Sequence, residues 1–108
     1  MAPQGYVAAA GISDIPQGTM KTVRIAGRNI ALINVDGEIF AVDDTCTHAQ
    51  CSLGNEGFLE GQVITCGCHG AQYDVTTGKV LGLPATVDIQ SYPVRITDNT
   101  VYVAVPTV

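Results

Sequence analysis

The chain has 108 residues, of which 46% are hydrophobic, and it carries a formal net charge of −5 with a pI of about 4.6. This length is typical of one domain, and the apolar content argues against a disordered chain. Only five residues are Lys or Arg, which argues against nucleic acid as a partner because phosphate binding needs basic side chains. No apolar run approaches the roughly 20 residues of a membrane span, and the N-terminus lacks the basic start of a signal peptide. We therefore expect a cytoplasmic protein without a membrane span.

Short segments in which apolar and polar residues alternate occur along most of the chain. Their period of two and their content of Val, Ile, Tyr and Thr predict strands at residues 6–10, 21–26, 29–35, 38–42, 62–66, 92–97 and 100–105. The pairs Asp36-Gly37, Asp98-Asn99 and Gly27-Arg28 predict two-residue hairpin turns between them. No segment shows helical periodicity over more than about one turn. The sequence therefore predicts an all-β fold, an antiparallel sandwich or barrel.

One segment, about residues 43–85, breaks this alternation. It is rich in Gly and Thr and contains all four cysteines and both histidines of the chain. Because no linker or change of composition divides the sequence elsewhere, we expect one domain over residues 1–108. Residues 43–85 are predicted to form a small loop-rich subdomain within a β framework.

The cysteines and histidines occur in two blocks, "CTHAQC" at 46–51 and "CGCHG" at 66–70. Each block has a Cys followed closely by a His, as Cys46-x-His48 and as Cys66-x-x-His69. Seventeen residues separate His48 from Cys66, and "GFLEGQVIT" among them is predicted to form a hairpin. The hairpin would bring the two blocks together, each with one thiolate and one imidazole.

Several chemistries use cysteine and histidine at such spacing: a metal site, a redox disulfide or a catalytic thiol. Zinc accepts two sulfur and two nitrogen ligands, so a structural zinc protein is one alternative. Zinc fingers and ribbons, however, usually draw their cysteines and their histidines in like pairs. Here each block mixes one sulfur with one nitrogen donor, which suits a two-iron cluster whose irons have different ligands.

The pattern C-x-H followed by C-x-x-H resembles the signature of the Rieske proteins. The blocks "CTHxxC" and "CxCHGxxYD" are similar to those of the Rieske subunits of cytochrome bc complexes, including the extra cysteine in each loop. The short length and the ending "YPVRITDNTVYVAV" look more like the small Rieske ferredoxins that supply oxygenases. "LGLPA" at 81–85, with Pro84, is similar to the proline loop that covers the cluster in this family. The resemblance extends over about residues 6–105.

The resemblance implies that one [2Fe-2S] cluster is bound by four residues. Cys46 and Cys66 would bind one iron, and His48 and His69 the other. Two thiolates in place of four leave the oxidised cluster without net charge, so it accepts an electron more easily. Rieske centres accordingly have potentials of about −150 to +300 mV, against about −400 mV for plant-type ferredoxins.

Two cysteines, Cys51 and Cys68, are left over by this assignment. They could be free buried thiols, a redox-active pair or a structural disulfide. In the related cytochrome-complex proteins the equivalent pair is a disulfide that bridges the two cluster loops, so the resemblance implies a Cys51–Cys68 disulfide. Such a bond would suggest an oxidising compartment or a thermophilic source.

The stretch "HGAQY" contains residues that would tune the potential of a cluster. High-potential relatives have a Ser two residues after the second His and a Tyr two residues further on; here these positions hold Ala71 and Tyr73. Ala cannot donate a hydrogen bond to a bridging sulfide, so we predict a potential below theirs. Tyr73 would bond a cysteine sulfur, or else is an ordinary strand aromatic. Gly70 is expected to serve the backbone conformation and amide access near sulfur.

We therefore expect a one-electron carrier, not an enzyme, that passes electrons between a reductase and an acceptor oxidoreductase or oxygenase. The alternative is a Rieske subunit or soluble domain of a larger oxidoreductase or quinol-oxidising complex. The extra cysteines favour that alternative, and Ala71 and the lack of a membrane anchor count against it.

Overall fold

A computed structural model of the chain describes residues 5–44, 52–67, 70–82 and 88–105. Within them, three antiparallel sheets account for most residues, so the prediction of an all-β fold is confirmed. The described part of the chain contains no helix that is long and apolar enough to span a membrane. The strands are β1 (Tyr6–Gly11), β2 (Met20–Ile25), β3 (Arg28–Val35), β4 (Glu38–Asp43), β5 (Phe58–Glu60), β6 (Val63–Thr65), β7 (Gln72–Asp74), β8 (Val80–Gly82), β9 (Ser91–Tyr92), β10 (Val94–Thr97) and β11 (Thr100–Ala104).

The central sheet has the order β2-β3-β4-β9 and is built from two tight hairpins. Asp36 and Gly37 form the second turn with φ angles of 52° and 93°, as their sequence predicted. The first turn was predicted one residue too late: Ile25 pairs with Arg28, so the turn is Ala26-Gly27 and Arg28 begins β3. This type of turn requires a positive φ at its first residue, and Ala26 adopts a φ of 52° although it is not a glycine.

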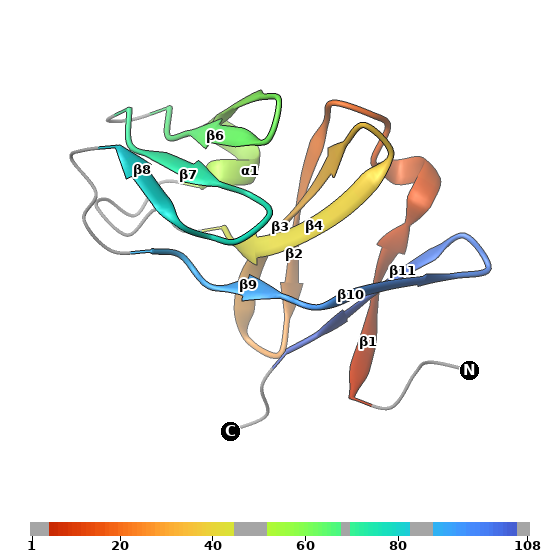
Figure 1. Cartoon of the computed structure of the whole chain (residues 1–108). Coiled ribbons are helices and arrows are strands. Elements are labelled where there is room, and N and C mark those ends of the chain that lie inside the picture. The colour runs from red at the N-terminus through yellow and green to blue at the C-terminus, as the bar shows by residue number, and fades with distance from the viewer. Residues whose placement is uncertain (1–4, 45–51, 68–69, 83–87, 106–108) are drawn as a thin grey trace.

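The central sheet is buried on both faces, which makes the fold three layers deep (Figure 1). Successive residues of β3 from Ile30 to Ile33 have no exposed surface. Ile30 and Leu32 pack into one hydrophobic cluster, whereas Ala31 and Ile33 pack into the other. Because side chains alternate between faces along a strand, β3 contributes to both layers of the core at once.

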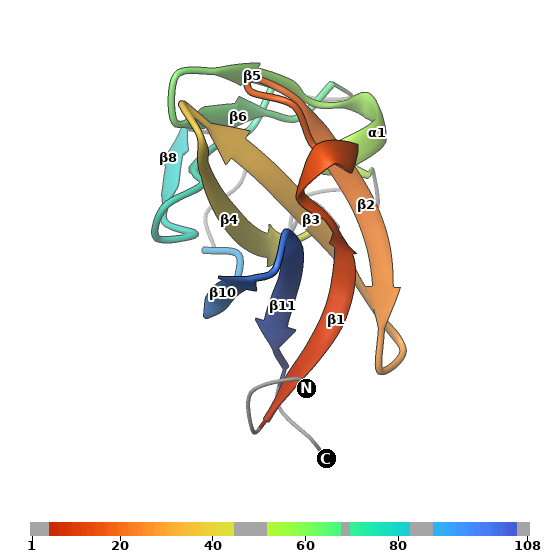
Figure 2. The same ribbon diagram turned by 90° about the vertical axis from the view of Figure 1, so that its right-hand side faces the viewer.

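The first outer layer is the sheet β1-β11-β10, which packs on the central sheet (Figure 2). Asp98 and Asn99 form the β10–β11 turn with φ angles of 52° and 64°, again as predicted. The chain passes from the central sheet to this layer through Pro93, which separates β9 from β10. A proline suits that junction because it has no N–H to contribute to a ladder.

The second outer layer is a sheet of very short strands, β5-β6-β7-β8, together with one helical turn, α1 (Leu53–Glu56). The predicted "GFLEGQVIT" hairpin is confirmed as β5 and β6, joined by Gly61 and Gln62. Ser52 caps α1, since its hydroxyl oxygen accepts a hydrogen bond from the Asn55 amide. Ile64, Tyr73 and Leu53 face the central sheet from this layer and have no exposed surface.

Candidate metal centre

Four of the residues predicted for the site lie within the described part of the chain: Cys66, Gly70, Ala71 and Tyr73. They belong to the β6–β7 hairpin of the small sheet and to its connecting loop. The remaining predicted residues lie outside the described residues: Cys46, His48, Cys51, Cys68, His69 and Pro84.

The β6–β7 loop is held by two backbone hydrogen bonds at Cys66. The Cys66 amide donates to the Ala71 carbonyl at 2.7 Å, and the Gly70 amide donates to the Cys66 carbonyl at 2.9 Å. Gly70 has a φ of 77°, a region that glycine adopts without strain. Cys66 is 2% exposed and forms no disulfide. The loop therefore places a buried, unbridged thiol at its base.

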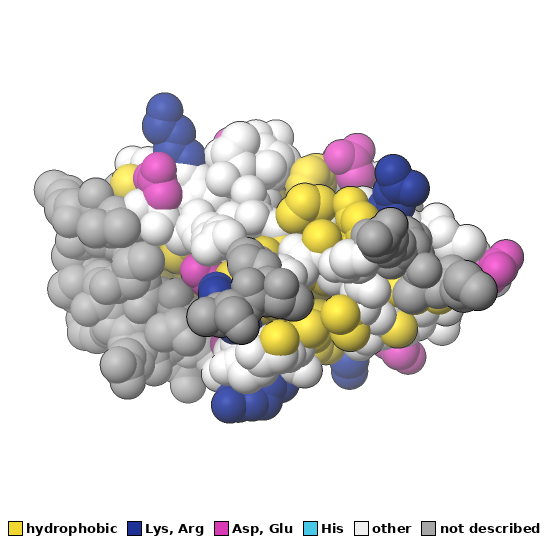
Figure 3. Space-filling model, turned by 90° about the horizontal axis from the view of Figure 1, so that it is seen from below, with side chains coloured by type: hydrophobic (Ala, Val, Ile, Leu, Met, Phe, Trp, Pro, Cys, Tyr) yellow, Lys and Arg dark blue, Asp and Glu magenta, His cyan; other side chains and the backbone are white. Residues whose placement is uncertain are grey.

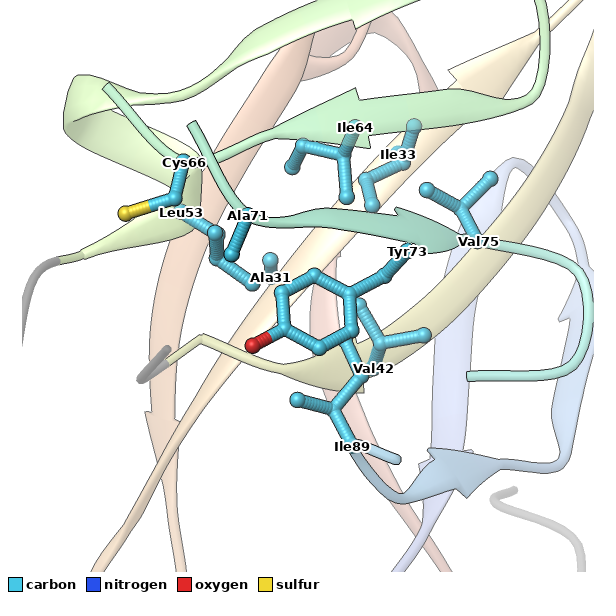
Figure 4. Packing of buried hydrophobic residues seen from close by; sticks show 10 residues of the cluster. All are labelled: Ala31, Ile33, Val42, Leu53, Ile64, Cys66, Ala71, Tyr73, Val75 and Ile89. Atoms are coloured by element: carbon cyan, nitrogen blue, oxygen red, sulfur yellow. The ribbon is translucent and has the colours of Figure 1, made fainter. Parts of the chain in front are cut away.

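Figure 4 shows how Cys66 sits at the edge of a hydrophobic cluster. Its sulfur and the Tyr73 hydroxyl point to the same side, away from Ile33 and Val75. Ala71 packs in this cluster with Leu53, and both have no exposed surface. The floor of the β6–β7 loop is thus apolar and closed to water, and the Cys66 sulfur and the Tyr73 hydroxyl are buried on one side of it.

Asp44 closes the segment 45–51, which contains the first cysteine-histidine block. Its carboxylate accepts hydrogen bonds from the Thr22 hydroxyl at 2.8 Å, the Ser52 hydroxyl at 2.6 Å and the Gly54 amide at 2.8 Å. Its carbonyl accepts from the Leu53 amide at 2.6 Å. Asp44 is 2% exposed, so these bonds form where water does not compete with them, and they hold the two ends of the segment together.

Gly54 is needed for this closure. A Cβ atom at position 54 would overlap the Thr22 hydroxyl oxygen and would lie 2.9 Å from a carboxylate oxygen of Asp44. Asp44, Ser52 and Gly54 were not predicted from the sequence. A serine followed by a possible helical turn is a capping signal that could have revealed Ser52, but a buried aspartate that ties a loop to another strand leaves no local pattern.

Asp43, the neighbour of Asp44, is hydrogen-bonded to the segment that returns to the central sheet as β9. Its carboxylate accepts hydrogen bonds from the Tyr92 hydroxyl and from the Gln90 amide. Arg28 also donates to the Tyr92 oxygen, at 3.3 Å. Burial and the bond to Asp43 raise the pKa of Tyr92, an effect that Arg28 opposes. The successive residues Asp43 and Asp44 thus hold two different segments by hydrogen bonds: Asp44 holds residues 52–54, and Asp43 holds residues 90–92.

The segment 83–87, which contains Pro84, is closed in a similar way. The Asp88 carboxylate accepts a hydrogen bond from the Val80 amide at 2.8 Å, and the Ile89 amide donates to the Gly78 carbonyl at 2.8 Å. Gly78 has a φ of 79°, and a Cβ there would overlap the Ile89 carbonyl oxygen. Figure 1 shows the described residues that flank 45–51, 68–69 and 83–87 at one end of the molecule. The fold therefore gathers the described residues that flank all three segments at the same end of the molecule.

Similarity to known proteins agrees with this arrangement. The model of the Rieske [2Fe-2S] domain matches residues 5–93. The ferredoxin component of the naphthalene 1,2-dioxygenase/salicylate 5-hydroxylase systems of Ralstonia sp is 46% identical over 93 residues, which cover 86% of this chain and 88% of that protein. The biphenyl dioxygenase ferredoxin subunit of Pseudomonas sp. (strain KKS102) is 37% identical over 98 residues, covering 91% of this chain and 90% of that protein.

Two solved structures show the same fold. The ferredoxin of Sphingomonas yanoikuyae B1 superposes with a TM-score of 0.88 at 31% identity, covering 94% of this chain and 99% of that one. A chain from the complex of reduced oxygenase and oxidized ferredoxin in carbazole 1,9a-dioxygenase superposes with a TM-score of 0.87 at 35% identity, covering 94% of each chain. The donor chemistry fits an iron–sulfur cluster, since Cys66 offers a buried thiol without a disulfide, at the end of the molecule where the described neighbours of the other cysteines and of both histidines lie.

Proposed function

This chain belongs to the Rieske [2Fe-2S] family, and from that premise we propose that it carries single electrons from a reductase to the terminal oxygenase of a dioxygenase system. The chain holds one Rieske-type [2Fe-2S] cluster and is an electron-transfer component, not the catalyst. Its relatives are ferredoxin components, and they match it over most of their own length. The predicted carrier is therefore favoured over the alternatives, a subunit of a quinol-oxidising complex and a structural zinc protein.

The ligand assignment is part of the proposal. Cys46 and Cys66 bind one iron, and His48 and His69 bind the other. The bound cluster supplies a site that takes up and releases one electron. Cys66 supports the assignment because its thiol is buried and unbridged, as a thiolate ligand requires. The apolar floor made by Leu53 and its neighbours keeps water from that side of the site.

The other tuning residues follow from the same site. Tyr73 is fully buried in the same hydrophobic cluster as Cys66, which suits a donor to a cysteine sulfur. Ala71 offers no hydroxyl to a bridging sulfide, so the potential lies below that of relatives with serine there. Gly70 shapes the Cys66 loop through its positive φ. Pro84 belongs to a segment whose ends are fixed at Val80 and Asp88, as expected of a loop that covers the cluster.

A disulfide between Cys51 and Cys68 is the next element of the proposal. It would join two segments whose described neighbours, Asp44 and Cys66, are fixed by hydrogen bonds. Alkylation under denaturing, non-reducing conditions followed by mass measurement should leave both cysteines unlabelled. Labelling of both would remove the disulfide. We further assign residues 1–108 to one domain with a cluster-binding subdomain at about 43–85, and the protein to the cytoplasm.

The observation that carries the proposal is the match of residues 5–93 to the Rieske domain, together with relatives that are ferredoxins over nearly their whole length. The purified protein should be red-brown and contain about two irons and two sulfides per chain. Added to a reductase and the oxygenase of a naphthalene 1,2-dioxygenase system, it should support substrate-dependent oxygen consumption. A protein that keeps its cluster but supports no turnover with any dioxygenase tested would contradict the proposed function.

A further inference from the structure

The acidic residues of this chain are not spread evenly over the fold. Residues 43–88 contain six Asp and Glu residues and one lysine, Lys79, so this part carries a net charge of −5. The rest of the chain contains four acidic and four basic residues and is neutral. The whole net charge therefore belongs to the part that bears the cluster. Exposed charge of one sign steers a partner of the opposite sign toward that end.

The small sheet of this part has an outer face that is turned away from the core. Leu59, Ile64, Tyr73 and Val80 point inward, so the residues between them point outward. The outward row next to Cys66 consists of Phe58, Thr65 and Gln72, which are directly paired across three strands, with Leu81 at the far edge. We call these four residues the outer row.

The outer row contains the most exposed large hydrophobic residue of the described chain. Phe58 is 68% exposed and Leu81 is 52% exposed. Between them, the Gln72 amide donates to the Thr65 hydroxyl at 3.3 Å, which fixes the polar middle of the row. Exposed aromatic surface beside a functional site is typical of a protein interface, because such a side chain gains by being covered.

Acidic side chains accompany the outer row on the same face. Glu60 and Asp74 lie two pairs further along the sheet, opposite Val63, and Glu60 is exposed. Asp74 is held by hydrogen bonds from Gln62 and Thr76. The face thus combines apolar edges with negative charge, and Thr65 directly precedes Cys66 in the chain. A protein bound here would lie next to a cluster ligand, where electron transfer takes place.

The neutral part of the molecule offers a competing surface. Val7 and Ile96 are exposed there. An open groove runs along β4 from the Asp36-Gly37 turn; residues 91–94 and Ile96 border it, and Val75 and Thr76 of the acidic part also reach it. Figure 3 shows hydrophobic side chains open on the lower face, with charges of both signs around them. Charges of both signs surround this surface, so it would not attract a partner of one charge. The groove also begins near Glu38, at the end of β4 that is far from Asp43 and the cluster. The observations therefore favour the outer row.

From these observations we propose that the outer row is the docking surface for the electron acceptor, a terminal oxygenase that presents an apolar hollow rimmed by Lys and Arg. Phe58 enters the hollow, and Glu60 and Asp74 face its basic rim. Such an interface would be small and transient, as redox contacts are. This inference rests on the proposed function, because it takes the acceptor to be an oxygenase.

The test uses the cluster-loaded protein with reductase and the dioxygenase oxygenase that gives the fastest turnover with the wild type. Phe58→Ser should raise the KM of the oxygenase for this protein by about fivefold to tenfold, as loss of an interface anchor does. Its kcat, its potential and its cluster spectrum should not change. The matched control is Val7→Ser, an exposed hydrophobic residue in the neutral part, whose KM should stay within twofold of the wild type.

The charge is tested with a second matched pair. Glu60→Gln should weaken the rise of KM with ionic strength, whereas Glu38→Gln, an exposed glutamate of β4, should leave that dependence unchanged. An unchanged KM for Phe58→Ser, or an effect confined to reduction by the reductase, would overturn the assignment. Equal effects on both partners would support a shared surface that includes the oxygenase. A wild type that drives no oxygenase would instead refute the proposed function before any variant is made.

Discussion

The base of the molecule, formed by β1–β4 and β9–β11, and its cluster end, residues 44–90, are stabilised in different ways. β1 to β4 have six to eight residues each. Two-residue turns join β2 to β3 and β3 to β4, and each of these two hairpins has six residue pairs. The four strands of the cluster end have three residues each. Three-residue strands form too few ladder bonds to fix a loop, so side chains of aspartates provide the missing connections.

This difference shows where the structure has been adapted to hold a cofactor. The base is specified by alternating apolar residues, which bury two faces of one sheet. At the cluster end, Asp44 and Asp88 accept hydrogen bonds that close a segment, and Asp43 at the end of β4 accepts one from the Gln90 amide. The cluster itself and a Cys51–Cys68 disulfide would add further links. Substitution of these aspartates should therefore reduce cofactor binding more than the same substitution of an aspartate in the base.

The largest effect is expected from Asp44→Ala. The change leaves the Thr22 and Ser52 hydroxyls and the Gly54 amide without their acceptor. Because an unsatisfied buried polar group costs about 1–3 kcal/mol, we expect a loss of at least ~3 kcal/mol of unfolding free energy. Urea denaturation and iron content measure it, and iron per chain should fall. Asp14→Ala, which removes one exposed hydrogen bond in the base, should cost about 0.5 kcal/mol or less. Similar losses of unfolding free energy in Asp44→Ala and Asp14→Ala would refute the proposed difference between the cluster end and the base.

Gly54→Ala should have a smaller effect on the same segment. The new methyl group meets the Thr22 hydroxyl and Asp44, so the loop closure must shift, at a cost of about 1–3 kcal/mol for overpacking. Thr22→Ala removes one of the two obstacles. The double variant should therefore lose less stability than the sum of the two single changes, as a double-mutant cycle would show. Strict additivity would mean that the contact at Thr22 does not limit position 54.

Ala71→Ser addresses the potential of the cluster. If the new hydroxyl reaches a sulfide, it stabilises the reduced state, and the potential rises by about 59 mV for each 1.4 kcal/mol. We expect a rise of this order, measured by redox titration. Ala41→Ser is the control, because Ala41 is 2% exposed in the core of the base. It should lower stability without moving the potential. An unmoved potential in Ala71→Ser would show that the hydroxyl does not contact the cluster.

The smallest effect concerns Asp74 and pH. The hydrogen bond from Thr76 lowers the pKa of Asp74, partly opposed by desolvation. A carboxyl whose pKa is lower in the folded state stabilises the fold above its unfolded pKa, and this contribution is lost as pH falls below about 4. Asp74→Asn should therefore flatten the acid side of the stability profile slightly, as urea midpoints at pH 7 and pH 3 would reveal. If the variant lost more stability than the wild type between pH 7 and pH 3, the pKa of Asp74 would not be lowered in the folded state.

Much of the base could be predicted from the sequence, because strand period and turn residues are local signals. Asp36-Gly37 and Asp98-Asn99 were predicted correctly since both pairs tolerate positive φ. Ala26-Gly27 was missed by one residue, because alanine is a poor indicator of that conformation. The family and the cluster were also predictable, since Cys46-x-His48 and Cys66-x-x-His69 have the spacing that resembles the family's signature.

The supports of the site could not be predicted in the same way. Asp44 acts through Thr22, which is 22 positions away, and Asp43 acts through Tyr92, which is 49 positions away. Such contacts depend on the assembled sheets and leave no periodic trace in the sequence. The need for glycine at position 54 likewise cannot be predicted from the sequence, because it arises from Thr22, which the fold places against Gly54. The residues proposed to bind the cofactor follow a local pattern, whereas those that position the loops depend on tertiary contacts.

The central claim is that two cysteines and two histidines hold the cluster, and it can be tested through the histidine nitrogens. The chain has only two histidines, His48 and His69. Pulsed electron paramagnetic resonance of the reduced protein, prepared with ordinary and with ¹⁵N-labelled histidine, therefore reports on these two side chains alone. The account predicts couplings from two histidine nitrogens bound to iron, both of which change on labelling. An intact [2Fe-2S] signal that shows no coupling to labelled histidine would contradict it.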